Sequence, residues 1–109
     1  MSTLSRLLTG RARSVSSFRT VTGADSIASS DLNNEIVFNS ASAAVLTLPS
    51  GNGLNATIDD IIAVYIAGAG IPTLAWTGST IRVPTGMPTP VQYSYMVVKW
   101  APTNEWVRV

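Results

Sequence analysis

The sequence predicts a small all-β protein: one antiparallel β-sandwich of jelly-roll type, preceded by an extended basic N-terminal arm. Glutamate, glutamine and lysine, the usual residues of exposed helix faces, number only four among 109 residues, whereas serine and threonine number 25. Short segments rich in β-branched residues also recur between turn sequences, about every eight to twelve residues, which is typical of a sandwich. A chain of this length has room for one such domain.

The composition favours a binding subunit over an enzyme. Hydrophobic residues make up 46% of the chain and charged residues 12%, so little of the surface is charged. Such a surface suits a subunit whose faces are covered by neighbours. The absence of cysteine and histidine excludes disulfides and thiolate metal sites, and it removes the commonest general base. We therefore expect no enzymatic activity, no cofactor and no bound metal.

Membrane insertion is not expected either. The longest apolar run, Ile61–Ala69, is much shorter than the roughly 20 residues that a helix needs to cross a bilayer. The sequence therefore predicts no membrane partner.

The charges are divided unevenly along the chain. The first twenty residues contain four arginines and no acid, whereas the remainder contains three basic and six acidic residues. Leu4, Leu7 and Leu8 fall on one helical face, but the Ser/Arg mixture that follows is too polar to fold alone. We therefore predict a docking arm over residues 1–17 and a β-sandwich domain over residues 18–109.

The basic arm has three interpretations. Its composition fits a nucleic-acid grip or a mitochondrial presequence, although four arginines with one nearby aromatic make a thin phosphate-binding surface, so no nucleic-acid partner is expected. The favoured interpretation is docking on an acidic protein surface, because arginine pairs bidentately with carboxylates and an arm that orders on binding wraps a large area. The expected partner-binding residues are Leu4, Arg6, Leu7, Leu8, Arg11, Arg13, Phe18 and Arg19.

Eight segments between turn sequences are predicted strands. Ile61–Ala67 is an almost continuous apolar run, as in a strand that is buried on both faces. Val91–Trp100 alternates between two faces, and a hairpin joins it to the last strand, so that Trp106 lies near Trp100 across the ladder. The predicted strands are 18–22, 35–38, 44–48, 61–67, 73–77, 80–83, 91–100 and 105–109, and residues 25–34 are a predicted loop.

Five aromatic side chains have two interpretations. They could form a platform on which a glycan stacks, or they could anchor the core and the contacts between subunits. Three tryptophans in so small a domain favour core and interface anchors. The five residues are Trp76, Tyr93, Tyr95, Trp100 and Trp106.

Two further motifs invite chemical interpretations. Asp59 and Asp60 are adjacent carboxylates, but neighbouring residues of a strand point to opposite faces, so a polar turn is favoured over a cation site or an acid/base dyad. Ala67–Gly70 is glycine-rich, but it lacks the lysine and the following helix of a phosphate loop. It therefore predicts a β-turn.

An ordered series of short sequences resembles a small β module of tailed-bacteriophage virion proteins. The series is Asn39–Pro49, Ala67–Gly70, Thr73–Trp76, a strand around Ile81, Gln92-Tyr93, Lys99-Trp100 and Asn104–Trp106. Modules of this kind occur in head decoration (cement) proteins and in tail fibres and spikes. The likeness covers roughly residues 30–109, and it implies a structural role in a virion without catalytic residues.

The resemblance implies a head decoration protein on the outer capsid surface. Such a protein would bind the major capsid protein and copies of itself, as a dimer or trimer, and would stabilise contacts between capsid subunits. The alternative is a component or adaptor of a tail fibre or tail spike, whose aromatic face would bind a host glycan. An enzyme that uses Asp59, Asp60 or Lys99 is the least supported class.

Overall fold

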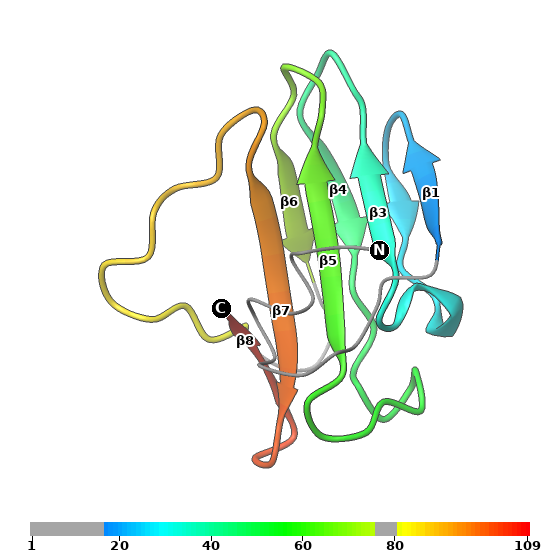
Figure 1. The fold of residues 1–109 in the computed structure, drawn as a ribbon, viewed down its shortest axis with the longest axis vertical. Coiled ribbons are helices and arrows are strands. Elements are labelled where there is room, and N and C mark those ends of the chain that lie inside the picture. The colour runs from blue at the N-terminus through cyan, green and yellow to red at the C-terminus, as the bar shows by residue number, and fades with distance from the viewer. Residues whose placement is uncertain (1–16, 76–80) are drawn as a thin grey trace.

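The computed structural model describes residues 17–75 and 81–109, and these two ranges form a small all-β fold with almost no helix. Figure 1 shows the strands in two layers. The elements are β1 (Phe18–Val21), β2 (Asp25–Ser26), the 3-10 turn η1 (Ser29–Asp31), β3 (Glu35–Phe38), β4 (Ala44–Thr47), β5 (Ile61–Ile66), β6 (Pro72–Ala75), β7 (Tyr95–Ala101) and β8 (Glu105–Arg108).

The strands form a five-stranded sheet, in the order β1-β3-β5-β7-β8, and a three-stranded sheet, in the order β2-β4-β6. From β1 to β6 the chain changes sheet at every strand, and each strand pairs in parallel with the strand two places earlier. The chain therefore coils, as in a parallel β-helix. Only β7 and β8 add antiparallel pairs. The all-β class is confirmed, but the expected antiparallel arrangement is wrong, since one sheet is mixed and the other parallel.

Close stacking of successive loops explains the coil. The loop between β5 and β6 lies directly on the loop between β3 and β4, and the Gly70 N–H donates to the Ser40 carbonyl at 2.8 Å. A Cβ atom at Gly68 or Gly70 would collide with the backbone of Ser40 or Ser42. The predicted turn at Ala67–Gly70 therefore carries the chain to the other sheet and does not reverse it beside its own strand.

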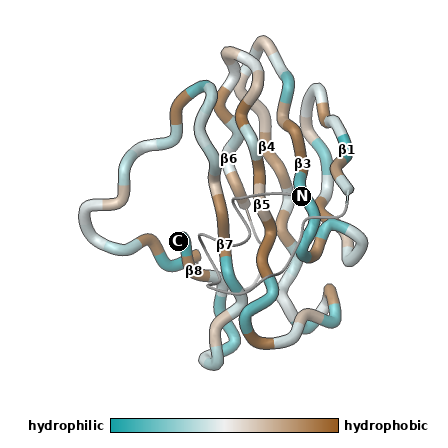
Figure 2. Tube along the Cα trace, viewed as in Figure 1, coloured by the Kyte–Doolittle hydropathy of each residue, from teal (hydrophilic) through white to brown (hydrophobic). Residues whose placement is uncertain are grey.

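One main core lies between the two sheets. It is built from the inward side chains of both sheets, including Ile62, Val64 and Ile66 of β5. Ile61, Ala63 and Val97 form a second, smaller buried cluster, so β5 is buried on both faces, as its apolar run predicted. The hydrophobic colouring along β3 and β5 in Figure 2 marks this central part of the five-stranded sheet.

Trp100 and Trp106 are in contact, as expected from the predicted hairpin. Trp100 of β7 and Trp106 of β8 are register partners, and their ring centroids lie 5.1 Å apart. The Trp106 Nε1–H also donates to the Pro49 carbonyl at 3.1 Å. The pair therefore ties the hairpin to the loop that follows β4.

Several predicted boundaries differ from the structure. The strand expected from Val91 begins only at Tyr95, because Tyr93 has a φ of 65° and the Ser94 hydroxyl bonds back to Val91 in a turn. The strand expected at 80–83 is reduced to one bridge at Arg82, with residue 80 outside the described ranges. The loop expected at 25–34 contains β2 and η1. Within residues 17–75 and 81–109, no helix has the length and apolar character needed to cross a membrane.

Replacing Gly51 with alanine tests the packing of Trp100. The indole ring of Trp100 lies where the added Cβ would be placed. We expect Gly51→Ala to lower the free energy of unfolding by about 2 kcal/mol through overpacking. Gly23→Ala is the matched control, since a Cβ at Gly23 meets nothing within 4 Å. Urea denaturation measures both variants, and equal midpoints would contradict this packing.

Candidate binding groove

Part of the predicted binding set lies outside the described residues. The structure therefore neither assembles nor separates these side chains. They are Leu4, Arg6, Leu7, Leu8, Arg11, Arg13 and Trp76.

The four aromatic residues of the predicted set that the structure describes do not gather into one face. Trp100 and Trp106 are core residues, with exposed fractions of 3% and 0%, whereas 71% of Tyr93 and 39% of Tyr95 are exposed. Tyr95 packs against Tyr65, with ring centroids 5.0 Å apart. Of the predicted anchors in the described ranges, two therefore serve the core and two are available to a partner.

Two of the predicted partner-binding residues, Phe18 and Arg19, belong to β1. Phe18 is exposed at the edge strand. Arg19 donates to the buried carboxylate of Asp31 at 2.8 and 3.0 Å and to Asp25 at 3.0 Å. These contacts, the Asp31 hydrogen bonds foremost, raise the pKa of Arg19 above its ordinary value. The guanidinium thus ties β1 to β2 and η1, and it is already paired within the chain.

The two adjacent aspartates serve separate contacts. Asp59 forms an ion pair with Lys99 at 3.0 Å. Asp60 is buried, where it accepts hydrogen bonds from Asn33 Nδ2 and from the Thr57 N–H, both at 2.9 Å. The two carboxylates therefore hold the turn before β5 and do not converge on one point. In the described ranges, no cluster of three or more acidic side chains is placed to hold a metal ion.

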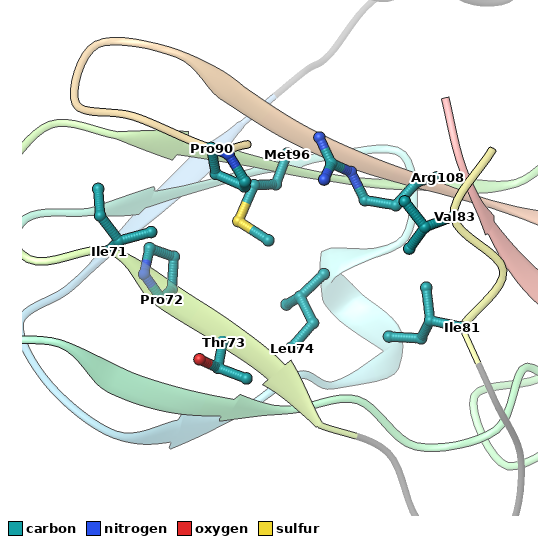
Figure 3. Close-up of a pocket in the computed structure, with 9 residues that line it drawn as sticks. All are labelled: Ile71, Pro72, Thr73, Leu74, Ile81, Val83, Pro90, Met96 and Arg108. Carbon is teal, nitrogen blue, oxygen red and sulfur yellow. The ribbon is translucent and has the colours of Figure 1, made fainter. Parts of the chain in front are cut away.

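A groove forms because the two sheets differ in width. The five-stranded sheet continues through β7 and β8, beyond the last strand of the three-stranded sheet, β6. A cavity of about 510 Å³ lies between β6 and the segment 81–83 (Figure 3). Ile71 and Leu74 line one side, Ile81 and Val83 the other, and Met96 and Arg108 lie between them.

The segment 81–83 is fixed by its contacts with β8. The Arg82 N–H donates to the Trp106 carbonyl, and the Arg108 N–H donates to the Arg82 carbonyl, both at 2.8 Å. On the exposed side, Arg82 Nε pairs with Glu105, and this hydrogen bond lowers the pKa of the Glu105 carboxyl. The groove wall is therefore held by its backbone hydrogen bonds to β8, and the Arg82 side chain does not line the groove.

Arg108 is the charged group of the groove. It lies in β8 opposite Val98, on the core face, and only 9% of the residue is exposed. Its Nε atom is buried without a hydrogen-bond partner in the described part of the chain. Burial lowers the pKa of the guanidinium, which nevertheless remains protonated at neutral pH. A buried cation whose Nε lacks a hydrogen-bond partner attracts an anion.

The outer edge of β6 offers backbone hydrogen-bonding groups beside Arg108. On its inner edge the Ala75 carbonyl accepts from the N–H of Leu48, the residue that directly follows β4. Because alternate residues of a parallel strand bond to opposite sides, the N–H and C=O of Leu74 face the outer edge. Within the described ranges, β6 pairs only with β4.

Sequence reasoning missed Arg108 as a site residue. A signal was present, because residues two apart in a strand share a face and Trp106 was among the expected core or interface anchors. Comparison of the chain with protein-family models, curated proteins and solved structures finds no significant match. Function is therefore inferred from the geometry and from the resemblance stated from the sequence.

Tyr93 combines exposure with a strained backbone. Its φ of 65° is unfavourable for a bulky residue, and the other non-glycine residues with positive φ in the described ranges are asparagine or aspartate. We expect Tyr93→Asn to raise the free energy of unfolding by about 1 kcal/mol, since asparagine tolerates this conformation. Thermal or urea denaturation measures it. A Tyr95→Asn control should instead lose stability, because it removes the contact with Tyr65.

Proposed function

We propose that the chain is a structural subunit of a tailed-phage virion, namely a head decoration protein that binds the outer capsid surface. In this role it stabilises contacts between major capsid subunits, with copies of itself as further neighbours, and it catalyses no reaction and holds no cofactor. We further propose that the two facing sheets form the sandwich body of such a module, connected as a coil.

The supporting observation is that no exposed charged side chain of the described ranges lacks a partner. In residues 17–75 and 81–109, each charged side chain is buried or has a partner within the chain. The pairs are Arg19 with Asp25 and Asp31, Lys99 with Asp59, Arg82 with Glu105 and Glu35 with Tyr95, while Asp60 and Arg108 are buried. Charged residues are depleted in the centres of protein interfaces, so a surface of this kind suits an assembly subunit.

Large apolar side chains are exposed on the same surface. Each has an exposed fraction of 39% or more, and burial against capsid neighbours would remove this area from water. Repetition over many equivalent sites would turn a modest contact into a large stabilisation of the shell. The exposed residues are Phe18, Val45, Ile58, Val83, Val91, Tyr93, Tyr95 and Val109.

The type of assembly comes from the sequence resemblance of residues 30–109 to phage virion modules. The tail-fibre alternative has less support, since it needs an aromatic face for a host glycan. Trp100 and Trp106 are buried in the core, which leaves Tyr93 and Tyr95 as the exposed aromatics of the predicted set in the described ranges. Two tyrosines make a weaker stacking surface than five aromatic residues.

Virions that lack the protein provide the test of this role. We expect them to release their genome at a lower temperature than complete virions, and added full-length protein should restore the difference, because each bound copy stabilises the shell. Heat release of the genome is followed by dye fluorescence. Equal release temperatures with and without the protein, or labelling of the tail in electron micrographs, would contradict the decoration role.

Removal of residues 1–16 tests the predicted docking arm. Ser17 is retained because its carbonyl accepts the Glu35 N–H at 3.1 Å. We expect the truncated protein to keep its circular dichroism spectrum and to lose its place on particles, since the arginines and leucines of the arm would contact the partner. Full occupancy of particles by the truncated protein would refute the role of the arm.

A further inference from the structure

We propose that the groove binds an extended acidic segment of a partner protein, which adds as a strand to the outer edge of β6 and places a carboxylate against Arg108. This inference deepens the proposed function, and it rests on that function in taking the partner to be a neighbouring protein of the assembly. Three features of the groove support it, and the chain's own acids decide between possible occupants.

The first feature is the unbalanced charge of Arg108. Only 9% of Arg108 is exposed, its Nε has no hydrogen-bond partner in the described ranges, and no ion pair there supplies the counter-charge that a buried cation needs. A carboxylate matches the planar fork of donors on arginine, and such pairs are among the strongest hydrogen-bonded contacts in proteins. A carboxylate is therefore the group that complements Arg108 in this groove.

The second feature is the apolar wall on both sides of that charge. Ile71 and Leu74 face Ile81 and Val83 across the cavity. A ligand that fills the cavity therefore carries apolar groups beside its carboxylate. A ligand strand that carries apolar side chains and one acid on the same face fits this wall.

The third feature is the edge of β6. The N–H and C=O of Leu74 face this edge, and strand addition would satisfy both. A small apolar acid would satisfy Arg108 and the walls, but it would leave the edge unpaired. Strand addition accounts for all three features.

The occupant is a protein of different sequence and not a second copy of this chain. All six acidic residues lie in the described ranges, and each already has a partner: Asp25 and Asp31 with Arg19, Asp59 with Lys99, Glu105 with Arg82, Asp60 with Asn33 and Thr57, and Glu35 with Tyr95. The arm, residues 1–17, contains no acid. Charge complementarity therefore points to a foreign acidic strand.

A pair of synthetic peptides tests the proposal on the full-length protein. Each has alternating valine and threonine over nine residues, with lysines at both ends for solubility, and one central valine replaced by glutamate or by glutamine. We expect the glutamate peptide to bind at least tenfold more tightly than the glutamine peptide, as measured by calorimetry. NMR shifts should map it to Leu74 and to the segment 81–83.

Two arginine variants separate the site from general effects of charge. Arg108→Met should abolish the preference for glutamate and keep or raise the unfolding midpoint, because methionine fills the space without a buried charge. Arg82→Met is the matched control, since Arg82 lies beside the groove with its side chain 67% exposed and paired with Glu105. It should retain the preference.

Four results would overturn the proposal. They are equal affinity for the two peptides, no saturable binding of either, binding of hexanoate as tight as that of the glutamate peptide, and self-association that Arg108→Met abolishes. Because these assays need no virions, they also separate the two proposals. Peptide binding without any effect on particles would leave the groove in place and reject the decoration role.

Discussion

Parallel stacking of one coil of chain on the next is the constraint on which the rest of this structure depends. The loop at Gly68 and Gly70 lies against the backbone of Ser40 and Ser42, and only glycine permits so close an approach. This contact sets β5 beside β3 and β6 beside β4 in register. Each coil therefore adds one strand to each sheet, and one core fills the space between them.

The groove follows from the way in which the coil ends. After β6 the chain stops alternating, and β7 and β8 both join the five-stranded sheet. The three-stranded sheet has no strand to place opposite them, so the edge of β6 and the inner face of β8 border a common cavity. Arg108 lies at this border. The unequal number of strands in the two sheets thus forms the groove that we propose as a binding surface.

The electrostatics of the molecule support the same view. Its other charged side chains in the described ranges each have an ion-pair or hydrogen-bond partner within the chain. Arg108 is the exception, since it is buried and its Nε has no hydrogen-bond partner there. A surface of this kind is suited to protein contacts and gives specificity through one buried charge pair.

The sequence located most strands but not their connections. Glu35–Phe38 has the predicted bounds, and the apolar run of β5 is buried on both faces as expected. A two-residue strand such as β2 is too short for any periodic pattern. The direction of pairing was missed because a glycine-rich turn has the same composition in a hairpin as at the corner of a coil. Only the contact of Gly68 with Ser40 distinguishes them.

The candidate site was only partly accessible to sequence reasoning. The burial of Trp106 was foreseeable, and the two-residue period of a strand then places Arg108 on the same face. The groove itself was not foreseeable, because it depends on the unequal numbers of strands in the two sheets. The backbone strain at Tyr93 was equally hidden, since the alternating pattern of Val91–Trp100 suggested an uninterrupted strand.

Disulfide trapping tests the parallel coil most directly, since the natural chain contains no cysteine. Val45 and Thr73 are register partners on the exposed side of β4 and β6, so Val45→Cys with Thr73→Cys should oxidise rapidly to an intramolecular disulfide. Val45→Cys with Ala75→Cys, about 8 Å apart by strand geometry, should not. Rapid oxidation of the second pair and not of the first would contradict the parallel register, and with it the open edge that forms the groove.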